Sequence, residues 1–137
     1  MPMNSRRLLI VDEEPARLDS LTDRLIAKGY LVMPAANGRE VLAFADQLPV
    51  DLALLDLDVL AQNSRKTFKR LTQDHPHVPI IFATACSNHL PAEFGNGGGI
   101  LLKKPIHLRK LLRTVKKLLC PSPPAWAPKN PSQKQQK

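Results

Sequence analysis

The sequence has no long apolar run and no recognisable export signal. No stretch reaches the 18 apolar residues that a membrane-spanning helix needs. Residues 1–7 lead into only about four apolar residues before Asp12, too short a core for a secretion signal. We therefore expect a cytoplasmic protein that does not contact the membrane.

Cysteine is scarce, with only Cys86 and Cys120 in 137 residues. The two show no metal-type spacing and are expected to be free thiols in a reducing compartment. His75-Pro-His77 superficially suggests a metal site, but the proline and the lack of further ligands favour a surface loop. The glycines between Gly95 and Gly99 lack the Lys-Ser/Thr of a phosphate-binding loop.

The net charge is +8, and three of these charges lie in the last 18 residues, which contain no acid. A basic surface can bind nucleic acid or an acidic protein. A solvated helix face is the simpler explanation of the same pattern, and we expect no direct contact with nucleic acid. Much of the remaining charge comes from one late segment: Arg109, Lys110, Arg113, Lys116 and Lys117.

Short apolar runs alternate with amphipathic segments. The runs, predicted as strands, lie at 8–11, 30–35, 52–55, 78–83 and 100–102, and helices are predicted at 16–28, 39–47, 62–74 and 108–119. Continuous apolar strands indicate a parallel sheet covered on both faces. The sequence therefore predicts an α/β fold with a doubly wound, five-stranded (β/α)5 sheet of flavodoxin-like order 2-1-3-4-5.

Two segments interrupt this pattern. Residues 88–99 contain Pro91 and several glycines, which predicts a short or distorted fourth helix. Residues 120–137 are rich in Pro, Gln and Lys and are expected to be a disordered tail. They are too few and too polar to fold into a DNA-binding module. We predict one domain at 1–119 and a tail at 120–137.

Polar side chains stand at the ends of four predicted strands. Asp12 and Glu13 follow the first strand and Asp56 the third. Thr84 follows the fourth strand and Lys104 the fifth. Any one of them could be a helix cap or a surface residue, but the carboxyl ends of parallel strands share one edge, where ligands bind.

The residue types at this edge suggest a chemistry. Crowded carboxylates repel one another unless a cation neutralises them, and Mg²⁺ prefers a few carboxylates together with phosphoryl oxygens. A carboxylate beside Mg²⁺, a lysine and a hydroxyl can accept a phosphoryl group, because these groups meet its charge from several sides.

The sequence resembles the receiver domain of two-component response regulators over residues 7–119. The matching segments are LLIVDEEP (8–15), VDLALLDL (50–57), VPIIFATA (78–85) and KKPI (103–106). The resemblance implies that Asp56 is the phosphoacceptor. It also implies that Asp12, Glu13 and Asp56 bind Mg²⁺ together with the backbone carbonyl of Asp58. The side chain of Asp58 adds a further negative charge near the site, where it is expected to affect the metal affinity or the rate of dephosphorylation.

The same resemblance implies that Thr84 is the hydroxyl that moves towards the phosphoryl group. Lys104 corresponds to the lysine of the family, and its bond to Pro105 is expected to be cis. Two positions depart from the family pattern. Leu60 stands where a proline is usual, with no glycine shortly after it, and Leu101 stands where an aromatic switch residue is usual.

A receiver is a signalling domain and not an enzyme, beyond catalysing its own phosphorylation and dephosphorylation. The resemblance implies a histidine kinase or phosphotransfer protein as donor and a protein effector downstream. It also suggests a homodimer through the fourth helix, the fifth strand and the fifth helix. The alternative is a pseudo-receiver, an interaction module with the same fold that is not phosphorylated; Leu60, Leu101 and the irregular fourth helix favour it.

Overall fold

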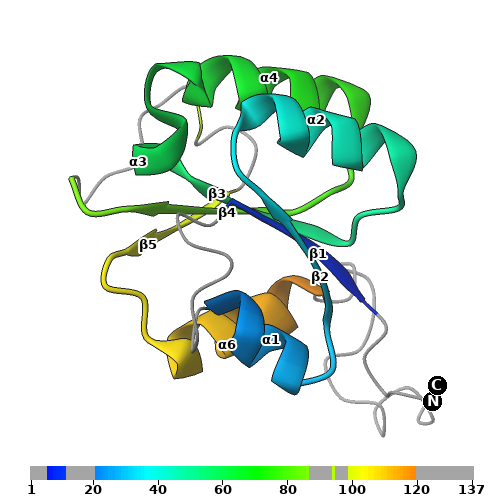
Figure 1. The fold of residues 1–137 in the computed structure, drawn as a ribbon. Helices are drawn as coiled ribbons and strands as arrows, with labels where there is room; N and C mark the ends of the chain where they lie inside the picture. The colour runs from blue at the N-terminus through cyan, green and yellow to red at the C-terminus, as the bar shows by residue number, and fades with distance from the viewer. Residues whose placement is uncertain (1–5, 12–20, 87–93, 95–98, 120–137) are drawn as a thin grey trace, which may run out of the picture.

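In the computed structural model, which describes residues 6–11, 21–86, 94 and 99–119, five strands form one parallel sheet (Figure 1). Their order is β2-β1-β3-β4-β5, which confirms the predicted topology. The strands are β1 (Arg7–Val11), β2 (Leu31–Ala35), β3 (Leu52–Asp56), β4 (Ile80–Thr84) and β5 (Ile100–Lys103). The start of the first predicted helix, most of residues 88–99 and the predicted tail lie outside the described residues.

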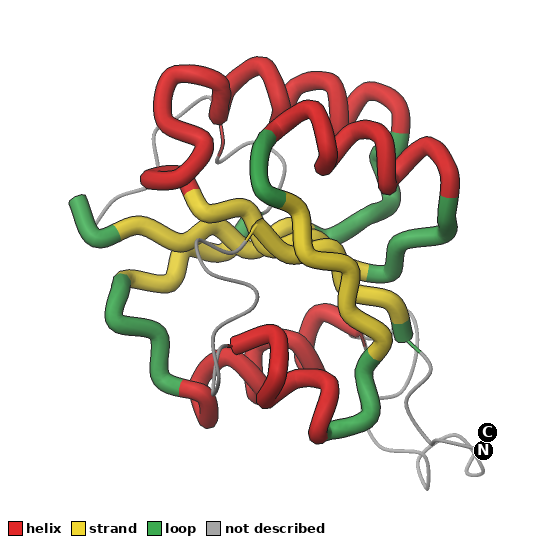
Figure 2. Tube along the Cα trace, in the orientation of Figure 1, coloured by secondary structure: helices red, strands yellow, loops and turns green. Residues whose placement is uncertain are grey.

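Helices cover both faces of the sheet, as Figure 2 shows. On one face lie α2 (Gly38–Gln47), α3 (Leu57–Leu60) and α4 (Ser64–Asp74), and on the other lie α1 (Leu21–Ala27) and α6 (Leu108–Leu119). A short 3-10 helix, Ala61–Asn63, connects α3 to α4. Among the helices that the structure describes, none combines the length and the apolar character needed to cross a membrane.

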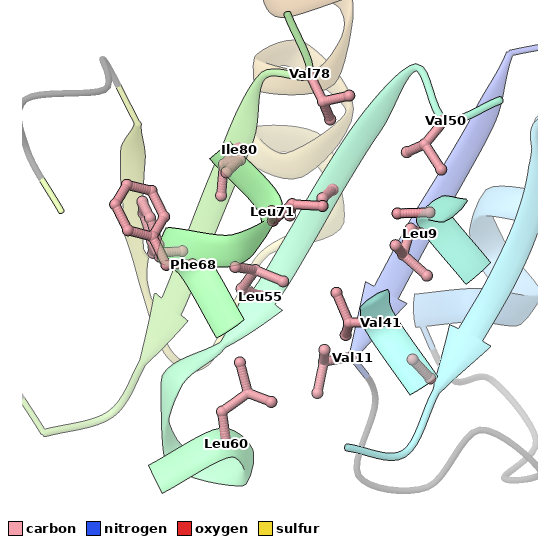
Figure 3. Packing of buried hydrophobic residues seen from close by; sticks show 14 of the residues in the cluster. Leu9, Val11, Val41, Val50, Leu55, Leu60, Phe68, Leu71, Val78 and Ile80 are labelled. Carbon is pink, nitrogen blue, oxygen red and sulfur yellow. The ribbon is translucent and has the colours of Figure 1, made fainter. Parts of the chain in front are cut away.

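The two helical layers give the sheet two separate cores. Successive side chains of a strand point to opposite faces, so Leu9 and Val11 of β1 pack towards α2 and α4, while Leu8 and Ile10 pack towards α1 and α6. Figure 3 shows the first of these cores, between the sheet and α2, α3 and α4. Every residue of β3 and β4 is buried, as expected for central strands covered on both faces.

The segment after Asp56 contains a short helix that was not predicted from the sequence. It turns at once into α3, and α4 begins only at Ser64, after the 3-10 turn. The cause is the side chain of Asp56, which caps α3 by accepting hydrogen bonds from two backbone N–H groups of its first turn. At the end of α3, Ala61 has φ 50°, a left-handed value that few residues with a side chain adopt.

Gly38 lets α2 approach α4 closely. A Cβ at this position would collide with the side-chain hydroxyl of the buried Thr67 in α4. We therefore expect Gly38→Ala to lower the free energy of unfolding by about 1–2 kcal/mol, because the cost of overpacking exceeds the gain in helix propensity. Urea denaturation followed by circular dichroism measures this loss.

The collision with Thr67 can be tested directly. In a Thr67→Ala background the obstructing hydroxyl is gone, so the same glycine substitution should cost much less than it does in the wild type. An equal cost in both backgrounds would show that the effect of Gly38→Ala does not come from contact with Thr67.

Candidate functional site

The site lies at the carboxyl edge of the sheet, where three neighbouring strands end. Asp56 is the last residue of β3, and its pairing partner in β4, Ala83, directly precedes Thr84. Lys104 directly follows β5, and its backbone N–H donates to the Thr84 carbonyl oxygen at 2.9 Å. The chain switches sides of the sheet between β1 and β3, and this is where parallel α/β sheets bind their ligands.

Asp56 is buried, and both of its carboxylate oxygens have partners. Only 6% of its surface is exposed. Oδ2 lies 2.6 Å from the Lys104 ammonium. Oδ1 accepts hydrogen bonds from the backbone N–H groups of Asp58 and Val59 at 2.9 and 3.1 Å. A buried carboxylate needs such compensation, because burial of an unpaired charge is costly.

The side chain of Asp58 makes contacts in the site that were not predicted from the sequence. Its Oδ1 accepts a hydrogen bond from the Thr84 hydroxyl at 2.6 Å. Its Oδ2 accepts from the backbone N–H of Ala85 at 2.8 Å and lies 3.2 Å from the Lys104 ammonium. The resemblance implied that the backbone carbonyl of Asp58 binds the metal and that its side chain adds a negative charge near the site, but these hydrogen bonds were not predicted.

The Thr84 hydroxyl is turned towards Asp58. Besides donating to Asp58, it accepts a hydrogen bond from the backbone N–H of Cys86 at 3.1 Å. The Lys104–Pro105 peptide bond is cis, which confirms the prediction. The structure therefore brings Asp56, Thr84 and Lys104 to one place, and it adds a second carboxylate between the hydroxyl and the ammonium.

The electrostatics of the site favour charged side chains. Burial alone would raise the pKa of Asp58, but hydrogen bonds from Thr84 and the Ala85 N–H, together with the Lys104 charge, outweigh it and lower that pKa below 3.8. Burial alone would lower the pKa of Lys104, but its hydrogen bonds and attraction to Asp56 and Asp58 raise that pKa above 10.5. One ammonium thus bridges two carboxylates.

The predicted metal ligands are described only in part. Asp12 and Glu13 lie outside the described residues; they follow Val11, the last residue of β1, and β1 pairs with β3 through Ile10 and Leu54. Within the described part of the chain, no group of three or more His, Cys, Asp or Glu side chains could hold a metal. The Asp56 carboxylate and the backbone carbonyl of Asp58 are oxygen donors of the kind that Mg²⁺ prefers.

The two departures from the family pattern both occupy apolar surroundings. Leu60, the last residue of α3, is 3% exposed and packs in the core. Leu101 is half-buried and pairs with Phe82 of β4. The aromatic residues lie deeper, where the ring of Phe82 has its centroid 5.3 Å from that of Phe68 and 5.2 Å from that of Phe94. Leu101 packs against the hydrophobic core that contains these three rings.

The remaining sequence candidates lie elsewhere. His75 of the His-Pro-His segment follows α4, and its Nε2 lies 3.0 Å from Asp46 Oδ1 in α2. This contact ties two helix ends together on the surface. Cys86 is an exposed free thiol, and Cys120 lies outside the described residues.

A doubly wound parallel sheet with an aspartate, a threonine and a lysine at its carboxyl edge defines the receiver class of signalling domains. The sequence matches the response regulator receiver domain over residues 8–116, and the chain belongs to this family.

Relatives and solved structures agree with this assignment. The chain is 31% identical to Protein PilH of Pseudomonas aeruginosa over 117 residues, which cover 82% of this chain and 97% of PilH. It is also 31% identical to the transcriptional regulatory protein GlrR of Escherichia coli, covering 86% of this chain but only 27% of GlrR. A CheY-like receiver domain protein from Methanospirillum hungatei superposes with a TM-score of 0.74 at 30% identity, over 84% of this chain and 94% of that one.

Proposed function

We propose that this domain accepts a phosphoryl group on Asp56 and that the phosphorylated form changes its binding to other proteins. The observation that carries the proposal is the contact of the buried Asp56 carboxylate with the Lys104 ammonium at 2.6 Å, with the Thr84 hydroxyl in the same cluster. A lysine at this position can neutralise charge on the incoming phosphoryl oxygens. The donor is a phosphohistidine of a histidine kinase or of a phosphotransfer protein.

In the proposed step, a carboxylate oxygen of Asp56 forms a bond to phosphorus while the bond from phosphorus to the histidine nitrogen breaks. The leaving imidazole keeps the electron pair of that bond and takes up a proton, and the product is an acyl phosphate on Asp56. Oδ1 is held by two backbone N–H groups and Oδ2 by Lys104, so the carboxylate has a fixed orientation for in-line attack.

The donor set also supports a requirement for Mg²⁺. Asp56 and the backbone carbonyl of Asp58 would hold it with Asp12 and Glu13, whose carboxylates follow the neighbouring strand β1 in the sequence. When bound, the ion would neutralise negative charge on the phosphoryl oxygens. The chain's own contribution is to orient Asp56 and to supply the cation Lys104.

The partners follow from the same proposal. The readout surface would be formed by β5, α6 and the helix predicted at 88–99, either as a homodimer contact or as a docking face for a protein effector. The five basic residues of the segment from Arg109 to Lys117 suit an acidic partner. The proposal includes a cytoplasmic location, no enzymatic turnover of other substrates, a receiver at 1–119 and a tail at 120–137.

The test is phosphorylation by acetyl phosphate with MgCl₂, followed by intact-protein mass spectrometry. We expect the wild type to gain the mass of one phosphoryl group, only when Mg²⁺ is present, and Asp56→Asn to gain none. Asp74→Asn, which removes an exposed carboxylate at the end of α4, is the matched control and should be phosphorylated normally.

The pseudo-receiver gives a different result in the same assay. No mass gain in the wild type, together with no Mg²⁺ binding by isothermal titration calorimetry, would refute phosphorylation and favour an interaction module that works without it. A mass gain that persists in Asp56→Asn would place the acceptor on another residue.

A further inference from the structure

The carboxylate of Asp58 already occupies the hydrogen-bond donors that surround Asp56. The Thr84 hydroxyl donates to its Oδ1, and the Ala85 N–H donates to its Oδ2. The Lys104 ammonium is shared, at 2.6 Å from Asp56 and 3.2 Å from Asp58. All three donors thus contact the carboxylate of Asp58, and only Lys104 also contacts Asp56.

A phosphoryl group on Asp56 would need the same donors. It brings up to about two negative charges and three strong acceptor oxygens, and it would be attached to a carboxylate that Lys104 already contacts. Because Lys104 reaches both carboxylates, a group bound to Asp56 lies near the side chain of Asp58. The phosphoryl group and the Asp58 carboxylate are both anions, so they repel each other. Each donor proton can form a good hydrogen bond with only one of them.

We propose that Asp58 is an autoinhibitory residue whose carboxylate competes with the phosphoryl group for Thr84, Ala85 and Lys104. This role of Asp58 rests on the proposed phosphorylation of Asp56, which the Asp58 carboxylate would oppose. In the unphosphorylated domain, Asp58 holds Thr84 and the start of the segment after β4 in place. Phosphorylation must displace this carboxylate, so that the two hydrogen bonds pass from Asp58 to the phosphoryl oxygens.

The test uses beryllium fluoride, an anionic mimic of a phosphoryl group, added with MgCl₂ and titrated by isothermal titration calorimetry. Hydrogen bonds to a charged group are each worth a factor of about ten or more in an equilibrium constant. We therefore expect Asp58→Ala and the nearly isosteric Asp58→Asn to bind the mimic about tenfold more tightly than the wild type. Asp74→Asn removes the same charge at a remote position and should bind as the wild type does.

A second substitution separates competition from a simple loss of negative charge. In the wild type, Thr84→Ala removes one hydrogen bond from the free domain and one from the complex, so the affinity for beryllium fluoride should change less than about twofold. In the Asp58→Ala background only the complex loses a hydrogen bond, and Thr84→Ala should weaken binding about tenfold. The amide resonance of Ala85 in a nitrogen–proton correlation spectrum gives a second readout, since Asp58→Ala should shift it without any ligand.

The outcomes are distinguishable from failure of the proposed function. Equal affinities of the wild type, Asp58→Ala and Asp58→Asn would overturn the competition, and so would an equal effect of Thr84→Ala in both backgrounds. If acetyl phosphate labels none of the variants but the affinities change as stated, the role of Asp58 stands while phosphorylation of Asp56 is refuted. If no variant binds the mimic or takes up a phosphoryl group, both proposals fail.

Discussion

Replacing Phe82 with alanine is expected to lower the free energy of unfolding by about 3–5 kcal/mol, the usual cost of removing a buried aromatic ring. Phe82 has no exposed surface and lies in β4, where its ring contacts those of Phe68 and Phe94. The backbone of Gly99 also comes so close to Phe82 that a Cβ there would collide with the ring. Urea denaturation followed by circular dichroism measures the loss.

Phe82→Leu is the matched control for this prediction. Leucine keeps an apolar side chain in the cluster, so it should cost considerably less than alanine. The two variants should also differ in how far they disturb the site, because Thr84 lies only two residues along the same strand. A loss below about 1 kcal/mol for Phe82→Ala would mean that α4 and its neighbours collapse into the space that the ring leaves.

Most of the helices and strands that were predicted correctly follow from the spacing of apolar residues along the sequence. The final helix has the predicted bounds, 108–119, because six leucine and valine residues recur on one face of it. The buried strands β3 and β4 were recognisable as continuous apolar runs. α3 was not predicted, because it has only four residues and depends on a single capping side chain, that of Asp56.

The site could be predicted at the level of which residues meet, since parallel topology places strand ends together. Asp56, Thr84 and Lys104 do meet, from β3, β4 and the residue after β5. The partners of each oxygen could not be predicted. The 2.6 Å hydrogen bond between Thr84 and Asp58 spans 26 residues, and it depends on how α3 turns after β3. No local pattern in the sequence encodes such a contact.

Removal of the bridging ammonium should show how much the site depends on it. We expect Lys104→Met, which keeps the length of the side chain and loses the charge, to slow phosphoryl uptake from acetyl phosphate by about 100-fold or more, the usual effect of deleting one group that stabilises an oxyanion. Time courses of intact mass measure the rate. Lys103→Met, a substitution of the exposed neighbouring lysine, is the matched control and should leave the rate nearly unchanged.

Lys104→Met should also be less stable than the wild type, by an amount that depends on pH. The pKa of Asp58 is lowered by its partners, so its contribution to stability is present above pH 3.8 and is lost as the pH falls through its folded value. The pKa of Lys104 is raised, so its contribution is present below pH 10.5 and is lost only as the pH rises through its folded value. The bridge therefore stabilises the fold throughout the neutral range.

Without divalent cations, Lys104→Met should therefore lower the free energy of unfolding by about 1–2 kcal/mol at pH 7. The value is modest because the side chains of Lys104 and Asp58 are both partly exposed. The cost should shrink at pH 3, because the pKa of Asp58 is no longer lowered by Lys104 in this variant and protonation of Asp58 relieves its repulsion of Asp56. Urea denaturation of the wild type and Lys104→Met at the two pH values measures this difference in stability. A cost that is the same at both would mean that Lys104 stabilises the fold by packing, and that the two carboxylates do not depend on its charge.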